Sequence, residues 1–275
     1  MDDSLKEVVD DLVEESLEEH NTPPPSFWKK VQTSIMMVAA IMISAGQFND
    51  TKDIFLSVYE ATLTNFTHSI EYDLIEKINV GSSMEYVKSI VGEPHVLKRS
   101  KVNNKLQFLY YSKAKYTLTL ISEDERLVGY SVFTLVDGFS PKIPFSEDLG
   151  EKSLASAHKE TGAYSYDIGN LLYYIESQDL GKEQMFLTLV RGYVEYGAIA
   201  QDEKVSENYR KQLNKVIENL EDKSTFAEND EALVVPLKKV RQTVFPNFYA
   251  VTELEPVIIA EALLTRYEFQ LFTKS

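Results

Sequence analysis

The spacing of apolar residues changes along this chain, and the changes predict where helices give way to strands. Apolar positions recur every three or four residues in residues 5–17 and 53–79, which is the period of a helix with one buried face. Between Leu106 and Leu135 apolar and polar residues alternate instead, as is typical of strands. From Tyr164 onward the helical period returns. The pattern predicts an α+β protein with helices before and after a small sheet.

Residues 1–25 are predicted to form an acidic amphipathic helix followed by a proline spacer. Leucines and valines form the apolar stripe of this helix, and nine carboxylates occupy most of the other positions before residue 21. Three consecutive prolines, Pro23–Pro25, end the helix and stiffen the connection that follows. Two interpretations remain open: the helix binds in a groove of a partner protein, or it packs on its own domain or frays in solvent.

Residues 27–50 are predicted to contain a single transmembrane helix. The uncharged run Val31–Asn49 would be about 28 Å long as a helix, close to the thickness of the hydrocarbon core of a bilayer. Phe27–Lys30 supplies aromatic rings and two lysines before the run. This favours an inner or plasma membrane location, with the N-terminus in the cytoplasm and the C-terminal domains outside. In the alternative interpretation the run is a buried helix of a cytoplasmic protein.

Residues 51–138 are predicted to form a small α+β module. Gly81–Pro94 has the signals of a short helix, because Ser82 and Glu85 have the spacing of a capping box and Gly92 suits a left-handed C-terminal position. Segments with alternating polarity follow it and predict a three-stranded antiparallel meander, at residues 106–110, 116–120 and 127–135.

This module resembles a known family of small lipoproteins. Gly81–Pro94 matches the pattern G-x-S-x-x-x-V-x-x-x-x-G-x-P, and such a helix followed by three strands resembles the BamE/SmpA type of fold over residues 73–137. The resemblance implies that the helix-end motif is structural and that the sheet presents a protein-binding surface. The chain has no cysteine and therefore no lipobox. The resemblance accordingly implies a small binding module rather than a role in outer-membrane assembly.

The rest of the chain is predicted to be a linker at residues 139–149 and an all-α domain at residues 150–275. Pro141 and Pro144 interrupt any regular structure in the linker. The helical period then recurs in five segments, at residues 164–177, 183–200, 206–222, 231–244 and 255–272.

The charge of the chain excludes one class of partner. A formal net charge of −15 argues against nucleic-acid binding, which needs an extended basic surface. Residues 94–122 reverse this sign locally, because they contain no acidic side chain. Their basic residues are a candidate face for an anionic partner such as lipid headgroups: Lys98, Arg99, Lys101, Lys105, Lys113 and Lys115. The same side chains could instead be ordinary solvated residues that discourage pairing at the edge of the sheet.

Tyrosines concentrate in the predicted helical domain. Those near Arg191 form a candidate aromatic pocket or interface, which consists of Tyr173, Tyr174, Arg191, Tyr193 and Tyr196. Tyrosine suits such a site because it combines a large apolar ring with a hydrogen-bonding hydroxyl. The alternative is that these residues are half-buried and serve packing alone.

No catalytic, cofactor-binding or metal-binding motif is present in the sequence. The four histidines lie in different segments, and there is no nucleophile elbow, Walker loop or dinucleotide fingerprint. We therefore expect a bacterial-type, membrane-anchored interaction or scaffold protein with a protein partner, no metal and no cofactor. Two alternatives remain: a cytoplasmic α+β binding protein with a buried apolar helix, and a hydrolase with its site between the two domains. Nothing in the sequence indicates an oligomeric state.

Overall fold

The computed structural model describes most of the chain after residue 67. The described residues are 32–33, 36–37, 68–159, 162–198, 203–226 and 231–274. Residues 68–275 form one compact unit. The acidic helix and proline spacer predicted at residues 1–25 lie outside the described residues.

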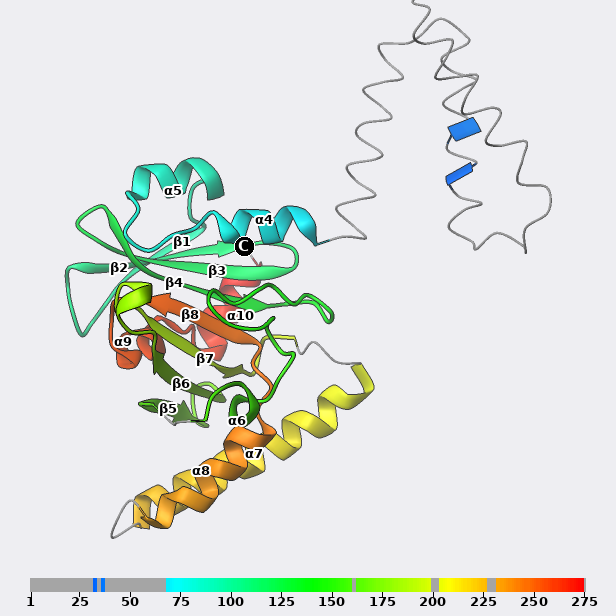
Figure 1. The fold of residues 1–275 in the computed structure, drawn as a ribbon, viewed down its shortest axis with the longest axis vertical. Coiled ribbons are helices and arrows are strands. Elements are labelled where there is room, and N and C mark those ends of the chain that lie inside the picture. The colour runs from blue at the N-terminus through cyan, green and yellow to red at the C-terminus, as the bar shows by residue number, and fades with distance from the viewer. Residues whose placement is uncertain are drawn as a thin grey trace, which may run out of the picture. The chain divides into compact units, whose positions relative to one another are not determined.

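One antiparallel sheet of eight strands organises the described part of this unit (Figure 1). The strands lie side by side in the order β1-β2-β3-β4-β8-β7-β6-β5, and every neighbouring pair is antiparallel. In chain order they are β1 (Val96–Arg99), β2 (Leu106–Ser112), β3 (Tyr116–Glu123), β4 (Arg126–Thr134), β5 (Tyr164–Asp167), β6 (Tyr173–Asp179), β7 (Thr188–Val194) and β8 (Phe248–Thr252).

The sheet consists of two four-stranded halves that meet at β4 and β8. Strands β1 to β4 are joined in sequence as hairpins, and so are β5 to β7, whereas two helices separate β7 from β8. Ala250 on β8 lies opposite Ser131 on β4 and opposite Val190 on β7. Each half therefore begins with a short strand at an edge of the sheet and ends with a strand at its centre.

Helices cover both faces of this sheet (Figure 1). Their bounds are α4 (Ser69–Glu76), α5 (Met84–Val91), α6 (Leu154–Ala157), α7 (Glu203–Phe226), α8 (Glu231–Thr243), α9 (Pro256–Ala262) and α10 (Arg266–Lys274), with a short 3-10 helix η1 (Lys182–Gln184) between β6 and β7. On one face, α4, α5 and residues 139–149 pack over the first half of the sheet, where Val87 and Ile143 share a core with Val132. Helices α9 and α10 pack on the opposite face, where Ile259 contributes to a second core.

A third core joins α6, α7 and α8 to the second half of the sheet. Tyr174 on β6 and Tyr193 on β7 are paired across the two strands, and both pack with Leu213 of α7 and Val240 of α8. Because side chains alternate along a strand, Tyr193 lies on the same face as Leu189, which belongs to the core under α4 and α5. The first and third cores therefore share one face of the sheet.

Helix α5 forms where the sequence predicts a short helix, although its N-cap lies one residue away from the predicted one. Ser83 is the N-cap, and its hydroxyl accepts a hydrogen bond from the backbone N–H of Tyr86 at 3.3 Å, one residue later than the cap predicted at Ser82. Gly92 ends the helix with φ of +89°, a conformation that residues with a Cβ rarely adopt. The helix predicted within Gly81–Pro94 is confirmed.

The predicted fold class, by contrast, is wrong. A three-stranded sheet followed by an all-α domain was expected, but the sheet has eight strands in the described residues, and four of them lie after residue 150. The segments predicted as helices at residues 164–177 and 183–200 contain β5, β6 and β7. Both faces of β7 are buried, so Leu189 and Val190 are both apolar and the alternation that marks a strand is lost.

The predicted linker is part of the packed structure. Phe139, Ile143 and Leu149 are buried in the core beneath α4 and α5. Residues 139–149 therefore connect the two halves of the sheet while lying against one of its faces. The predicted segments at 206–222 and 231–244 correspond to α7 and α8, and the segment predicted at 255–272 forms two helices, α9 and α10.

The prediction of a single transmembrane helix is also corrected. Among the residues that the structure describes, no helix is long and apolar enough to cross a membrane. Most of the run Val31–Asn49 itself lies outside the described residues. The membrane anchor is therefore not part of the function proposed below.

Candidate functional site

Two buried arginines lie on the face of the sheet that α6 and α8 cover. Arg191 is on β7 and is 2% exposed, and Arg241 is on α8 and is 7% exposed. Glu176 on β6 is 4% exposed and lies directly opposite Arg191 across the two strands. Arginine and glutamate are rarely this buried unless they are paired, so the hydrogen bonds of these side chains decide whether the arrangement is stable.

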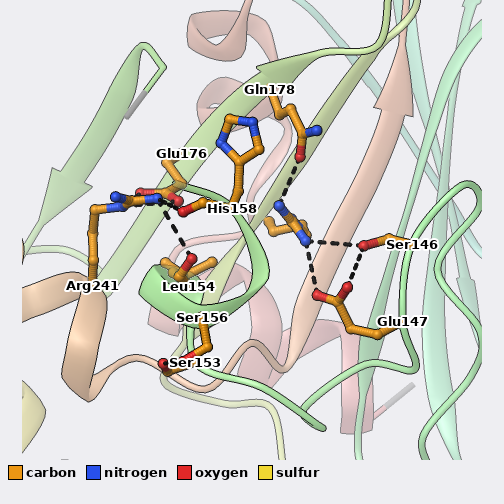
Figure 2. Close-up of polar contacts among 10 residues, drawn as sticks. Ser146, Glu147, Ser153, Leu154, Ser156, His158, Glu176, Gln178 and Arg241 are labelled. Carbon is orange, nitrogen blue, oxygen red and sulfur yellow. Dashed lines mark hydrogen bonds and ion pairs between the residues drawn. The ribbon is translucent and has the colours of Figure 1, made fainter. Parts of the chain in front are cut away.

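Arg241 binds Glu176 on β6 and the main chain in and after α6 (Figure 2). Its Nε donates to both carboxylate oxygens of Glu176, at 2.9 and 3.2 Å. Its terminal nitrogens donate to the main-chain oxygens of Leu154, the first residue of α6, and of His158 and Lys159, which follow this helix. One guanidinium group thus fixes α8, α6 and β6 relative to one another, and the carboxylate that it faces is fully paired.

Arg191 makes a second polar network one strand further along. Its terminal nitrogens donate to Glu147 at 3.0 Å, to the hydroxyl of Ser146 at 3.1 Å and to the side-chain oxygen of Gln178 at 2.8 Å. Burial alone would raise the pKa of Glu147, but hydrogen bonds from Ser146 and from the backbone, together with the charge of Arg191, outweigh this effect and lower it. Glu147 is therefore held as a carboxylate.

The two networks support one wall of a surface hollow of about 410 Å³. The wall contains His158, whose main-chain oxygen binds Arg241, and Gln178, whose side chain binds Arg191 (Figure 2). Among the described residues, the hollow is lined by His158, Gly162, Ala163, Ser177, Gln178, Asp179, Thr188, Glu253, Leu254, Glu255 and Pro256. It lies where the ends of β6 and β7 meet the connection from β8 to α9.

The lining of this hollow is acidic. Asp179, Glu253 and Glu255 contribute three carboxylates, and no lysine or arginine is among the described lining residues. Glu253 is bound by both terminal nitrogens of Arg126, and this hydrogen bonding lowers the pKa of Glu253 below its usual value against the opposing effect of burial. Asp179 and Glu255 have no ion-pair partner in the described part of the chain. The hollow therefore suits a cation better than an anion.

The loop that joins β6 to β7 presents two large apolar side chains to solvent. Met185 is 70% exposed and Phe186 is 73% exposed. Both have φ of +57°, in the left-handed region that is unusual for residues other than glycine, asparagine and aspartate. The loop is nevertheless tied down, since the backbone N–H of Phe186 donates to the carbonyl of Gly181 at 2.8 Å and that of Leu180 to Leu187 at 2.9 Å. We call Met185 and Phe186 the hairpin tip.

The groups that line the hollow form no recognisable catalytic arrangement. The hydroxyl of Ser177 donates to the main-chain oxygen of Ala163 at 3.0 Å, so its proton is already used in a structural hydrogen bond. Among the described residues, no group of three or more histidine, aspartate or glutamate side chains is placed to hold a metal ion. What the arrangement offers chemically is binding: carboxylates for a cation, beside an exposed apolar tip.

No protein family, curated protein or solved structure matches this chain. The resemblance of residues 73–137 to the BamE/SmpA type therefore stays a prediction.

The structure does not gather the six predicted basic residues into one face. Lys98 pairs with Glu268 of α10 at 2.9 Å, Lys115 pairs with Glu71 of α4 at 3.0 Å, and Lys113 donates to a main-chain oxygen at the end of α5. The positions divide between opposite ends of the same strands: Lys98, Arg99, Lys101 and Lys105 in β1 and the turn that follows it, and Lys113 and Lys115 in the turn between β2 and β3. Half of the six thus stabilise contacts between elements.

The predicted aromatic pocket is divided between the two faces of the sheet. Tyr174, Arg191 and Tyr193 share the face under α6 to α8, where the two tyrosines belong to the core. Tyr173 and Tyr196 pack with the core on the opposite face, and the ring of Tyr196 stacks on Phe269 with centroids 4.1 Å apart. The members that come together are packed against other side chains, and none of the five lines the hollow.

Sequence reasoning missed the partners that make Arg191 significant. Glu176 and Arg241 are 65 positions apart, and no motif connects them. The hairpin tip had a local signal: Met185 and Phe186 are apolar residues in a short polar stretch that begins at Gly181. Gly181 indicates a turn at this place, and side chains in a turn have no core to enter.

Proposed function

We propose that this chain is a protein-binding module that contacts its partner through the hairpin tip. The observation that carries the proposal is the exposure of Met185 and Phe186 in left-handed backbone conformations. Large apolar side chains that stand free of a core mark interaction sites when they are held in place, and methionine and aromatic residues are enriched at the centres of interfaces. Strained backbone of this kind clusters at functional sites.

The energetics favour a binding role over a purely structural one. A left-handed conformation costs a residue with a side chain roughly 1–2 kcal/mol, and both positions of the tip carry this penalty. In the free protein the burial of these two side chains does not offset it, because both are exposed, and the main-chain hydrogen bonds of the loop hold the conformation. Full burial against a partner would contribute about 1.5–3 kcal/mol for each side chain. The strain is therefore compensated in a complex, and glycine would serve a simple turn better.

The tip is also pre-organised for contact. Its five main-chain hydrogen bonds within residues 180–187 fix the loop before any partner arrives. Ordering an interface loop on binding lowers affinity, so a loop that is already held loses less conformational entropy. Leu187, the next residue, is buried in the core under α4 and α5 and anchors the tip to the body of the sheet.

Site-specific photo-crosslinking tests this proposal. The full chain, with p-benzoylphenylalanine at position 186, is irradiated in the cells that make it, and the adducts are compared with those from the same group at position 267. Tyr267 on α10 is a matched control, because it is aromatic and 71% exposed. We expect a discrete adduct from position 186 that is absent from position 267. Identical adduct patterns, or none at position 186 in a folded protein, would overturn the proposal.

A further inference from the structure

We propose that the partner of the hairpin tip is a basic, amphipathic peptide segment, whose lysine or arginine side chain enters the acidic hollow beside the tip. This inference rests on the proposed function and names the chemistry of the partner. Its two parts are an apolar contact on Met185 and Phe186 and a charged contact with Asp179 and Glu255.

The tip and the hollow belong to the same hairpin. Asp179 on β6 and Thr188 on β7 are opposite one another in the sheet, and both line the hollow. Phe186 precedes Thr188 by two residues, so their Cα atoms are at most about 7 Å apart. Figure 1 shows η1 and α9 at the same end of the sheet. One short peptide therefore reaches both the apolar tip and the carboxylates.

Charge complementarity selects the occupant. Arg126 already neutralises Glu253, which leaves Asp179 and Glu255 as exposed carboxylates in the rim of the hollow. An anionic ligand would meet the carboxylates of Asp179 and Glu255, with no lysine or arginine among the described lining residues. A second copy of this chain is disfavoured because each copy carries a net charge of −15, and residues 1–20 of the chain itself have the wrong sign. A basic segment is favoured on all three counts.

The wall of the hollow is built to keep its shape. Arg191 donates a hydrogen bond to the side chain of Gln178, and Arg241 donates one to the main-chain oxygen of His158. Both guanidinium groups are buried, so these two lining residues are held in place from the protein interior. A volume of about 410 Å³ is in the range of sites that take small ligands or single side chains. Pre-organised polar groups lose little entropy on binding and therefore discriminate well between partners.

The experiment uses a defined probe on the full chain. A fluorescein-labelled peptide of alternating phenylalanine and lysine pairs is titrated with the protein, and its anisotropy is compared with that of the same peptide carrying glutamate for lysine. The test variant is Asp179→Asn/Glu255→Gln. The control variant, Glu218→Gln/Asp222→Asn, removes two exposed carboxylates from α7 and changes the net charge equally.

We expect the lysine peptide to bind, the glutamate peptide not to bind, and the test variant to weaken binding about fivefold. The control variant should leave binding unchanged, and Phe186→Ser should weaken it, because both parts of the site contribute. Affinity should fall as salt rises.

Equal weakening by the test and control variants would overturn the inference, because the peptide would then respond to net charge alone. Full binding by Phe186→Ser would also overturn it, because the hairpin tip would then make no contribution. Absence of binding by the lysine peptide would overturn it as well. A crosslink at position 186 together with any of these results would leave the proposed function standing and reject only its basic partner. Absence of that crosslink would reject the proposed function itself.

Discussion

Arg241→Met tests whether the guanidinium group of Arg241 is what allows Glu176 to be buried. The substitution keeps most of the side-chain volume but removes the guanidinium donors to Glu176 and to the three main-chain oxygens of residues 154, 158 and 159. Glu176, with 4% of its surface exposed, would remain as a buried carboxylate that still accepts a hydrogen bond from the hydroxyl of Tyr174. We expect the free energy of unfolding to fall by about 3–5 kcal/mol, the usual effect of breaking a buried ion pair.

The assay is urea denaturation of the full chain followed by far-UV circular dichroism. For a unit of this size, the loss corresponds to a melting temperature lower by about 6–20 °C. Arg126→Met is the matched control, since both terminal nitrogens of Arg126 donate hydrogen bonds to Glu253, but this pair lies on the surface. The control should lose less than about 1 kcal/mol.

A second variant separates the charge from the packing. Glu176→Leu/Arg241→Met removes both charges, and a buried ion pair replaced by apolar residues is often as stable as before. The double variant should therefore be more stable than Arg241→Met alone, which gives a favourable coupling energy between the two residues. A loss below about 1 kcal/mol for Arg241→Met, or strictly additive effects in the cycle, would refute the reasoning.

Two further predictions concern the tip and Glu147. Phe186→Gly should raise the free energy of unfolding by up to about 1 kcal/mol in the same denaturation assay, because glycine adopts φ of +57° without strain, whereas Phe186→Ala, which keeps the strain, should not. Equal stability of the two variants would contradict this. Because the pKa of Glu147 is lowered in the folded state, its contribution is present above the ordinary glutamate pKa of 4.5 and is lost as the pH falls below it. Stability measured from about pH 6 to pH 3 should therefore decline less steeply for Glu147→Gln than for the unmodified chain, and parallel curves would exclude this role.

Local signals in the sequence located the elements whose two faces differ or whose ends carry caps. The strands predicted to begin at Leu106 and Tyr116 begin there in the structure, because each follows a polar turn and the residues from Tyr116 to Leu120 alternate in polarity. Helix α5 was located by Gly92 and by serine at its start. These features depend on a few neighbouring residues, and the sequence contains them in full.

Local patterns do not predict features that depend on residues far apart in the sequence. The buried faces of β6 and β7 remove the alternation that would have identified them, and Tyr174 and Tyr193 then resemble residues of a buried helix. The sequence predicts only part of the candidate site. It indicates Arg191, but it does not indicate the partners Glu147 and Gln178, and Glu147 lies in the segment predicted as a linker. No local rule pairs residues 44 positions apart.

The position of β8 has a consequence for how the chain is made. Strand β8 lies at the centre of the sheet, between β4 and β7, yet it is the last strand to be synthesised. Until Phe248–Thr252 leaves the ribosome, both β4 and β7 have one edge without its hydrogen-bonding partner. The two half-sheets therefore lack the strand that joins them for the time that α7 and α8 take to emerge, at about 5–20 residues per second. Premature release before residue 252 would produce fragments with open apolar edges, which are substrates for chaperones and proteases rather than smaller working proteins.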